Sequence, residues 1–340
     1  MRNLVASRKK AAVALAAALS VALAASGAAL ARSHDGVKLA LVAYSTPKEA
    51  YGDLIAAFQK TSAGQNVSFT QSFGASGDQA RAVAQGLPAD VVHFSTELDV
   101  ATDVNAGVIA RTWKSDLPNQ AIPTTSVVVF VLRTGNPKHI KGWTDLVRPG
   151  VQVVTPNPFT SGAAKWNILA AYGYALRHGK TRQQAVDFVT ALFRNVVSQD
   201  KSGRDALNTF LAGKGDVLLT YENEAKLAQI KKQPVYYIIP RTTLRIDTPV
   251  AVTSTTKSPD AARAFARWLF TLDAQRIFAK WGYRPTDPSV FKEFASQFPA
   301  RPDVWTINYL GGWYKVDKPW FDPQSGTMAR IEQQIGGSTG

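Results

Sequence analysis

The sequence predicts an α/β protein in which the strands of mainly parallel sheets alternate with helices. Three observations support this fold class. Short apolar segments recur along the chain, and each leads through small polar residues into a segment that starts like a helix. These strand-to-helix units occur in two groups, which indicates two lobes. A chain of 340 residues, 45% of them apolar, can also bury a sizeable core and usually forms two lobes.

The first group contains three apolar strands that run into helix starts. After the first strand, Thr46 and Glu49 have the spacing of a capping box, and Pro47 suits a first helical turn. After the second strand, Ser76 and Gln79 have the same spacing. We therefore expect a capped helix after each of these strands. The three strands are expected at residues 39–44, 67–71 and 89–94.

The second group repeats the pattern. Strands are expected at 151–155 and 216–220, with helix starts at 160–164, 202–205 and 221–224. The long β-rich segment 126–133 is suited to cross from one lobe to the other, and 247–253 to return. The resulting domain prediction is a signal peptide at 1–31, a first lobe made of 32–125 and 250–340, and a second lobe at 126–249.

The N-terminal segment has the order of a cleavable secretory signal. A basic start that includes Arg8 and Lys9 precedes an apolar run from 11 to 25, and the small-residue site 29–31 follows. This run is shorter than the roughly 20 residues that span a bilayer, which argues against a membrane anchor. We therefore expect cleavage after Ala31 and export to a Gram-negative-type periplasm.

Charge and composition exclude several classes of site. The formal charge of +14 becomes +10 once the four cations of the signal are removed. Lysines and arginines are dispersed, without the basic motifs of nucleic-acid-binding proteins, but a dispersed positive field raises the local concentration of small anions. The chain has no cysteine, which excludes thiolate metal sites and thiol catalysis, and its four histidines lack metal-binding spacing. No metal or cofactor is expected.

Four of the helix starts are candidate anion-binding sites, around Ser45, Ser76, Ser161 and Gly203. A helix N-terminus presents unpaired N–H groups and a positive dipole end, and small residues allow an oxyanion to approach the backbone. Micromolar affinity needs about 8 kcal/mol, whereas one charge-assisted hydrogen bond gives roughly 1.5–3 kcal/mol. Several converging turns are therefore required. The alternative for each serine is that it only caps its helix.

Motifs of catalysis are missing. The sequence has no GxSxG elbow, no phosphate-binding P-loop and no dinucleotide fingerprint. Glu222 and Glu224 are two residues apart and would point in different directions on a helix. Asp78 could accept a proton from a protonated oxyanion, but an acid in a first helical turn is ordinary. No catalytic residue is predicted.

At these turns the sequence resembles the periplasmic sulfate-binding proteins of ABC importers over nearly the whole mature chain. Two blocks carry most of the resemblance: Thr155-Pro156-Asn157-Pro158 with Ser161-Gly162 and Trp166-Asn167, and Gly215-Asp216-Val217-Leu218 with Glu222-Asn223-Glu224-Ala225. The resemblance implies a two-lobe periplasmic-binding-protein fold, a hinged clamp that encloses a desolvated sulfate between its lobes. It also implies uncharged donors in place of a counter-ion.

Position by position, the resemblance implies seven ligand-binding residues. Ser45, Gly162, Ala163 and Gly203 would donate through backbone amides, Ser76 through its hydroxyl and amide, Ser161 through its hydroxyl, and Tyr221 through its side chain. Arg204 would brace the loop at Gly203 without touching the anion. The family commonly has Asp at Ser45, Gly at Ala163 and Trp at Tyr221. A tyrosine hydroxyl donates from a different point than an indole N–H, so the preference between sulfate and thiosulfate stays open.

The predicted function is therefore capture of sulfate by an exported, monomeric solute-binding protein, followed by delivery to the membrane subunits of an ABC importer. Alternative ligands are thiosulfate and, after it, molybdate or phosphate. The alternative from another class is an exported hydrolase of sulfate or phosphate esters. No nucleic-acid partner is expected.

Overall fold

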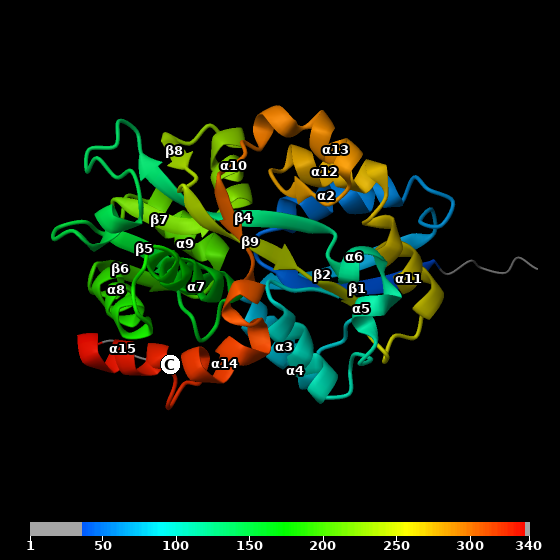
Figure 1. Cartoon of the computed structure of the whole chain (residues 1–340). Helices are drawn as coiled ribbons and strands as arrows, with labels where there is room; N and C mark the ends of the chain where they lie inside the picture. The colour runs from blue at the N-terminus through cyan, green and yellow to red at the C-terminus, as the bar shows by residue number, and fades with distance from the viewer. Residues whose placement is uncertain (1–35, 337–340) are drawn as a thin grey trace, which may run out of the picture. The chain divides into compact units, whose positions relative to one another are not determined.

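A computed structural model describes residues 36–336, so the predicted signal segment lies outside the described residues. In the described part, strands and helices alternate and form two sheets (Figure 1). The α/β fold class is therefore confirmed. None of the helices between 36 and 336 has the length and apolar character needed to cross a membrane.

The smaller sheet has four strands in the order β10-β3-β1-β2. Its central strand β1 pairs in parallel with β2 and β3, whereas β10 pairs antiparallel to β3. Its strands are β1 (Val37–Tyr44), β2 (Val67–Gly74), β3 (Val91–His93) and β10 (Val250–Val252). The helices that follow or cover these strands are α2 (Lys48–Phe58), α3 (Ser76–Ala84), α4 (Glu97–Asn105), α5 (Trp113–Asp116), α6 (Pro118–Ala121), α11 (Pro259–Trp268) and α12 (Leu272–Lys280). Helix α13 (Pro288–Glu293) packs against α12 and against β11 (Arg284–Pro285) of the larger sheet.

The larger sheet has eight strands, with β12-β9-β4-β7-β5-β6 as its main path and β8 and β11 also paired to β4. Its strands are β4 (Thr124–Arg133), β5 (Val153–Pro156), β6 (Val196–Asp200), β7 (Val217–Tyr221), β8 (Val235–Ile238), β9 (Thr242–Thr248), β11 (Arg284–Pro285) and β12 (Asp303–Trp305). Its helices are α7 (Gly162–Arg177), α8 (Arg182–Arg194), α9 (Gly203–Leu211), α10 (Glu222–Ile230), α14 (Trp313–Phe321) and α15 (Thr327–Ile335), and short 3-10 turns lie at Trp143–Val147, Ala295–Gln297 and Ile307–Leu310.

The larger sheet corrects the expectation of mainly parallel strands, because β4 runs antiparallel to β7, β8, β9 and β11. The first residues of β4 pair with the last residues of β9, so these strands run side by side in opposite directions (Figure 1). Only Pro249 separates β9 from β10, which belongs to the smaller sheet. The chain therefore changes sheets at Pro249.

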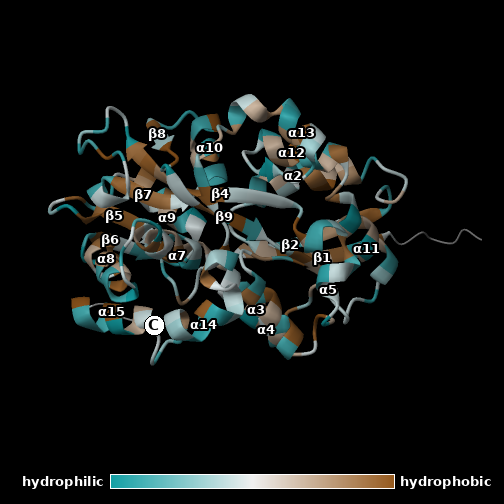
Figure 2. Cartoon of the chain, in the orientation of Figure 1, coloured by the Kyte–Doolittle hydropathy of each residue, from teal (hydrophilic) through white to brown (hydrophobic). Residues whose placement is uncertain are grey.

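Each sheet has its own hydrophobic core. One cluster joins β1 and β3 to α2, α11 and α12, and two further clusters cover the two faces of the larger sheet. In Figure 2, β5 and β7 are drawn largely brown, as expected of strands buried on both faces. The lobe boundaries stay a prediction. These boundaries assign residues 250–340 to the first lobe. Within that range, however, β12 pairs with β9, and Trp305 and Trp313 belong to a core of the larger sheet.

Candidate functional site

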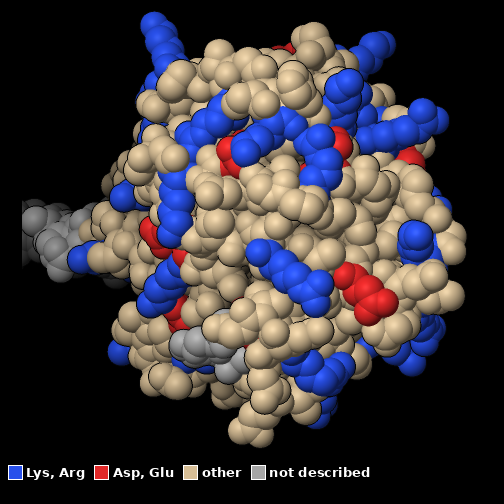
Figure 3. All heavy atoms as spheres, turned by 90° about the vertical axis from the view of Figure 1, so that its left-hand side faces the viewer, with Lys and Arg blue, Asp and Glu red and all other residues tan. Residues whose placement is uncertain are grey.

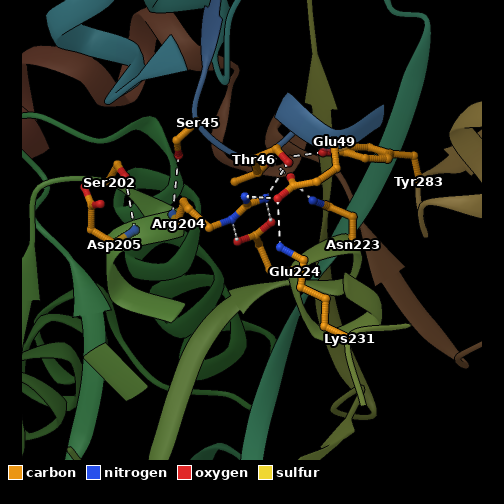
Figure 4. Close-up of polar contacts among 10 residues, drawn as sticks. All are labelled: Ser45, Thr46, Glu49, Ser202, Arg204, Asp205, Asn223, Glu224, Lys231 and Tyr283. Atoms are coloured by element: carbon orange, nitrogen blue, oxygen red, sulfur yellow. Dashed lines mark hydrogen bonds and ion pairs between the residues drawn. The ribbon is translucent and has the colours of Figure 1, made fainter. Parts of the chain in front are cut away.

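The first turns of helices from the two sheets contact one another. The Arg204 N–H in α9 donates to Ser45 Oγ, which follows β1, at 3.4 Å. The Gly77 N–H in α3 donates to the Thr160 carbonyl, just before α7, at 3.0 Å. Figure 4 draws the Ser45 contact. The structure therefore brings the candidate turns around Ser45, Ser76, Ser161 and Gly203 into one region.

At the start of α2 the predicted capping box is wrong, since the N-cap is Pro47 and no side chain caps the helix. Thr46 Oγ1 instead lies 3.2 Å from Tyr283 Oη and accepts from Asn223 Nδ2 at 3.3 Å. Glu49 pairs with Arg204. Tertiary partners have thus taken the groups that would have capped the helix.

The capping box predicted at Ser76 is also wrong. The N-cap of α3 is Ala75, without a side-chain cap, and Gln79 bonds Ser72. The buried Ser76 hydroxyl donates to Asp99 Oδ2 at 2.7 Å and accepts the Ser95 N–H at 2.8 Å. The Ser76 hydroxyl hydrogen is engaged by Asp99 in this arrangement, whereas its amide lies in the first turn of the helix, where no intrahelical partner exists.

Ser161 behaves unlike a helix cap. It occupies the N-cap position of α7 and is buried, but its side chain makes no capping bond. The next residue, Gly162, lies against the smaller sheet's lobe, because a methyl group on its Cα would be 2.6 Å from Ser95 Oγ. Ala163 is equally buried, and its Cβ would be 3.4 Å from a methyl group on Gly203. These contacts join the starts of α7 and α9.

Ser202, in contrast, is a true cap, and its Oγ accepts the Asp205 N–H at 3.2 Å. The side chain of Arg204 reaches away from the helix start. Its Nε and Nη2 each donate to Glu224 at 2.9 Å, Nη1 donates to Glu49 at 2.8 Å, and Nη2 also donates to the Thr46 carbonyl at 2.8 Å (Figure 4). Burial alone would lower the pKa of Arg204, but the two carboxylates raise it well above its usual value. The positive charge of Arg204 is therefore already paired with carboxylates of the protein.

Tyr221 ends β7, is fully buried, and places its Oη 2.6 Å from Ser95 Oγ. Burial raises the pKa of Tyr221 well above its usual value, so the phenol stays protonated and keeps a hydrogen to donate.

The acidic candidates are occupied elsewhere. Asp78 pairs with Arg81 and, at 3.1 Å, with Lys201. Glu222 and Glu224 point to different partners, as their spacing predicted, but they are fully buried and not simply helix-end charges. Glu222 Oε2 accepts from Arg284 Nε at 2.6 Å. No group of three metal-ligating side chains occurs within 36–336.

The family model for bacterial extracellular solute-binding proteins matches residues 39–284. This chain belongs to that family. The resemblance noted from the sequence is confirmed by a sulfate-binding protein of Synechococcus elongatus, 42% identical over 95% of this chain and 96% of the relative. A thiosulfate-binding protein of Pseudomonas aeruginosa is 36% identical over 89% of this chain and 95% of the relative.

A solved structure, the sulfate-binding protein SubI of Mycobacterium tuberculosis, is 44% identical to this solute-binding protein. It covers 84% of this chain and 100% of its own, with a TM-score of 0.81. The two-lobe solute-binding fold is therefore the fold of this chain.

Sequence reasoning missed Ser95 and Asp99 in this solute-binding protein. Ser95 lies two residues after the end of β3, and Asp99 forms the capping box of α4 with Thr96. The Thr96–Asp99 spacing was readable in the sequence, but nothing local indicated that Asp99 also holds Ser76. The bond between Ser95 and Tyr221 joins residues 126 positions apart.

Proposed function

We propose that this solute-binding protein captures sulfate between its two lobes and delivers it to the membrane subunits of an ABC importer. The observation that carries the proposal is the meeting of four helix starts from both sheets. The cations there already have carboxylate partners, since Arg204 is paired with Glu49 and Glu224, and Lys201 is paired with Asp78. The sulfate-binding relatives from Synechococcus elongatus and Mycobacterium tuberculosis favour sulfate.

The proposed donors are neutral and come from both lobes. Amides of Ser45, Ser76, Gly162, Ala163 and Gly203 join the side chains of Ser161 and Tyr221. At roughly 1.5–3 kcal/mol for each hydrogen bond to a charged group, several such bonds supply the about 8 kcal/mol of micromolar affinity after desolvation of the anion. Arg204 acts as a brace that holds the amide of Gly203 in place.

Discrimination against hydrogen phosphate follows from this chemistry. Sulfate needs only donors, whereas a protonated phosphate also presents an O–H that requires an acceptor. An unpaired buried polar group costs about 1–3 kcal/mol. Thiosulfate is the second candidate ligand, because a thiosulfate-binding relative is 36% identical to this chain.

Lysines and arginines lie dispersed over the face drawn in Figure 3, so they would attract small anions generally without forming a single binding patch. We further propose that the protein is exported, is cleaved after Ala31, and works as a monomer in the periplasm. The hinge would lie where the chain passes between the lobes, next to β4 and β9. Closure about this hinge would exclude water from the anion, as hinge closure does in periplasmic binding proteins.

Calorimetry tests the ligand. The mature protein is unfolded to remove bound ligand, refolded, and titrated with sulfate, thiosulfate, phosphate and molybdate. We expect saturable one-site binding of sulfate and no signal with phosphate. A signal with thiosulfate alone would replace the ligand and keep the class, and no binding of any of the four would overturn the proposal. Absence of turnover of aryl sulfate and phosphate esters by the same sample is expected.

A further inference from the structure

Ser95 lies where several proposed anion-binding elements meet. Its N–H donates to Ser76 Oγ at 2.8 Å, and its carbonyl accepts from Trp166 Nε1 in α7 at 2.8 Å. Its hydroxyl is 2.6 Å from Tyr221 Oη. One residue of the smaller sheet's lobe thus contacts α3, α7 and the end of β7.

The Ser95 hydroxyl also lies directly against the first turn of α7. A methyl group on Gly162 would be 2.6 Å from Ser95 Oγ and 2.7 Å from its Cβ, so only glycine permits this approach. The hydroxyl therefore lies beside amides that we propose to bind the anion. Ser95 and Tyr221 are both buried, which keeps water from competing for their hydrogens.

The two hydroxyls carry two hydrogens, and their mutual bond uses one of them in either direction. If Ser95 donates, the Tyr221 hydrogen is left over, and if Tyr221 donates, the Ser95 hydrogen is left over. Among the hydrogen bonds of residues 36–336, neither oxygen has a second protein partner. One hydroxyl hydrogen of the pair is therefore available next to the α7 amides.

We propose that Ser95 is a further ligand-binding residue and that Ser95 and Tyr221 act as a single donor to the anion, with either hydroxyl able to supply the hydrogen. This inference rests on the proposed function. It also explains how Tyr221 can replace the tryptophan that is common at this position in the family. The Ser95 hydroxyl can pass the hydrogen bond from the phenol to an anion that the phenol itself does not reach.

The pair predicts redundancy between its members. In Ser95→Ala or Tyr221→Phe the remaining hydroxyl turns its hydrogen to sulfate, so each variant should weaken binding only about 2- to 5-fold. The double variant loses the last hydrogen and should bind sulfate roughly 100-fold more weakly than the wild type, within the range expected for a bond to a charged group. The combined loss thus exceeds the product of the single losses.

Stability in the absence of sulfate should show the opposite coupling. Either single variant already breaks the mutual hydrogen bond, so the double variant should lose less unfolding free energy than the sum of the two. A residue that only supports the packing of Tyr221 would give less-than-multiplicative losses in both measurements.

The experiment is calorimetric titration with sulfate of the mature wild type, both single variants and the double variant, with urea unfolding of each ligand-free protein. Tyr51→Phe is the matched control, because it removes another buried tyrosine hydroxyl, bonded to His93 Nδ1 at 2.7 Å, and should leave sulfate affinity unchanged. If the double variant does not fold, Ser95→Cys combined with Tyr221→Phe keeps the size of the side chain and replaces the hydroxyl by a weak donor.

A double-variant loss equal to or below the product of the single losses overturns the inference while leaving sulfate binding by the wild type intact. Absence of sulfate binding by the wild type overturns the proposed function itself. The two failures are therefore distinguishable within one set of titrations.

Discussion

Charged and neutral groups occupy separate places where the helix starts of the two lobes meet. On one side, Arg204 pairs with Glu224 and Glu49, and Lys231 also pairs with Glu49, so two cations balance two carboxylates. On the other side, Ser161, Ser95 and Tyr221 present buried hydroxyls that carry no charge. In the proposed site the arginine is therefore already paired, and the donors left for the anion are neutral.

The charged side can be broken by Arg204→Ala, and this should have the largest effect on stability. The substitution leaves the fully buried carboxylate of Glu224 without its partner. Removal of one member of such a buried pair costs about 3–5 kcal/mol of unfolding free energy. Urea unfolding at pH 7 without sulfate measures the loss.

Arg263→Ala is the matched control, because it removes an exposed pair with Asp260 at 3.2 Å and should change stability little. Equal stability of Arg204→Ala and the wild type would mean that the buried Glu224 carboxylate does not need Arg204 as its partner. The contrast between a charged and a neutral side would then be wrong.

Asp103 places a titratable carboxyl one turn after Asp99 on the neutral side. Both of its carboxylate oxygens are buried without a partner, and burial, followed by the charge of Asp99, raises the pKa of Asp103 to about 7. An unfolded aspartate titrates near pH 4, so the folded state holds a proton that the unfolded chain releases, and stability falls as pH rises from about 4 to 7.

Asp103→Asn isolates this contribution. Relative to the variant, the wild type should lose about 2–3 kcal/mol of unfolding free energy between pH 5 and pH 8. Comparison with the variant is necessary because burial lowers the pKa of His93 to about 3, which makes His93 destabilising as pH falls and thus acts in the opposite direction. Parallel pH profiles of the two proteins would show that Asp103 is ionised throughout.

Two serines at helix starts sharpen the comparison, because one caps its helix and the other does not. Ser161→Ala should weaken sulfate binding about 10-fold, the loss of one bond to a charged group, with little change in stability because the side chain makes no capping bond. Ser202→Ala should lower the unfolding free energy by about 1 kcal/mol, since its hydroxyl caps α9, and should affect affinity less. Unchanged sulfate affinity in Ser161→Ala would remove Ser161 from the site.

Hydrophobic periodicity and small polar turns are local signals, so the sequence predicted β1 to β5, β7 and β10 and the starts of α2, α3, α7, α9 and α10, but not β6, β8, β11 or β12. It did not predict the direction of β4, which depends on the distant strands β7 and β9. The capping boxes at Thr46 and Ser76 failed because Asn223 and Asp99 engage those hydroxyls in the fold. Ser95 escaped notice because its partner Tyr221 is remote in sequence.

The smallest expected effect is the pH dependence of sulfate binding. Backbone amides and the Ser161 hydroxyl do not titrate between pH 5 and 8, and burial raises the pKa of Tyr221 well above that range. The dissociation constant should therefore change less than about twofold over this interval, as calorimetry at several pH values in one ionic strength can show.

A tenfold change would instead indicate that a titrating group is coupled to the neutral side. The structure offers one route, since Asp103 lies beside Asp99, and Asp99 accepts the Ser76 hydroxyl hydrogen at 2.7 Å. If that route operates, Asp103→Asn should abolish the pH dependence, whereas Arg204→Ala should leave it in place. The same titrations thus decide whether the ionisation of Asp103 affects sulfate binding.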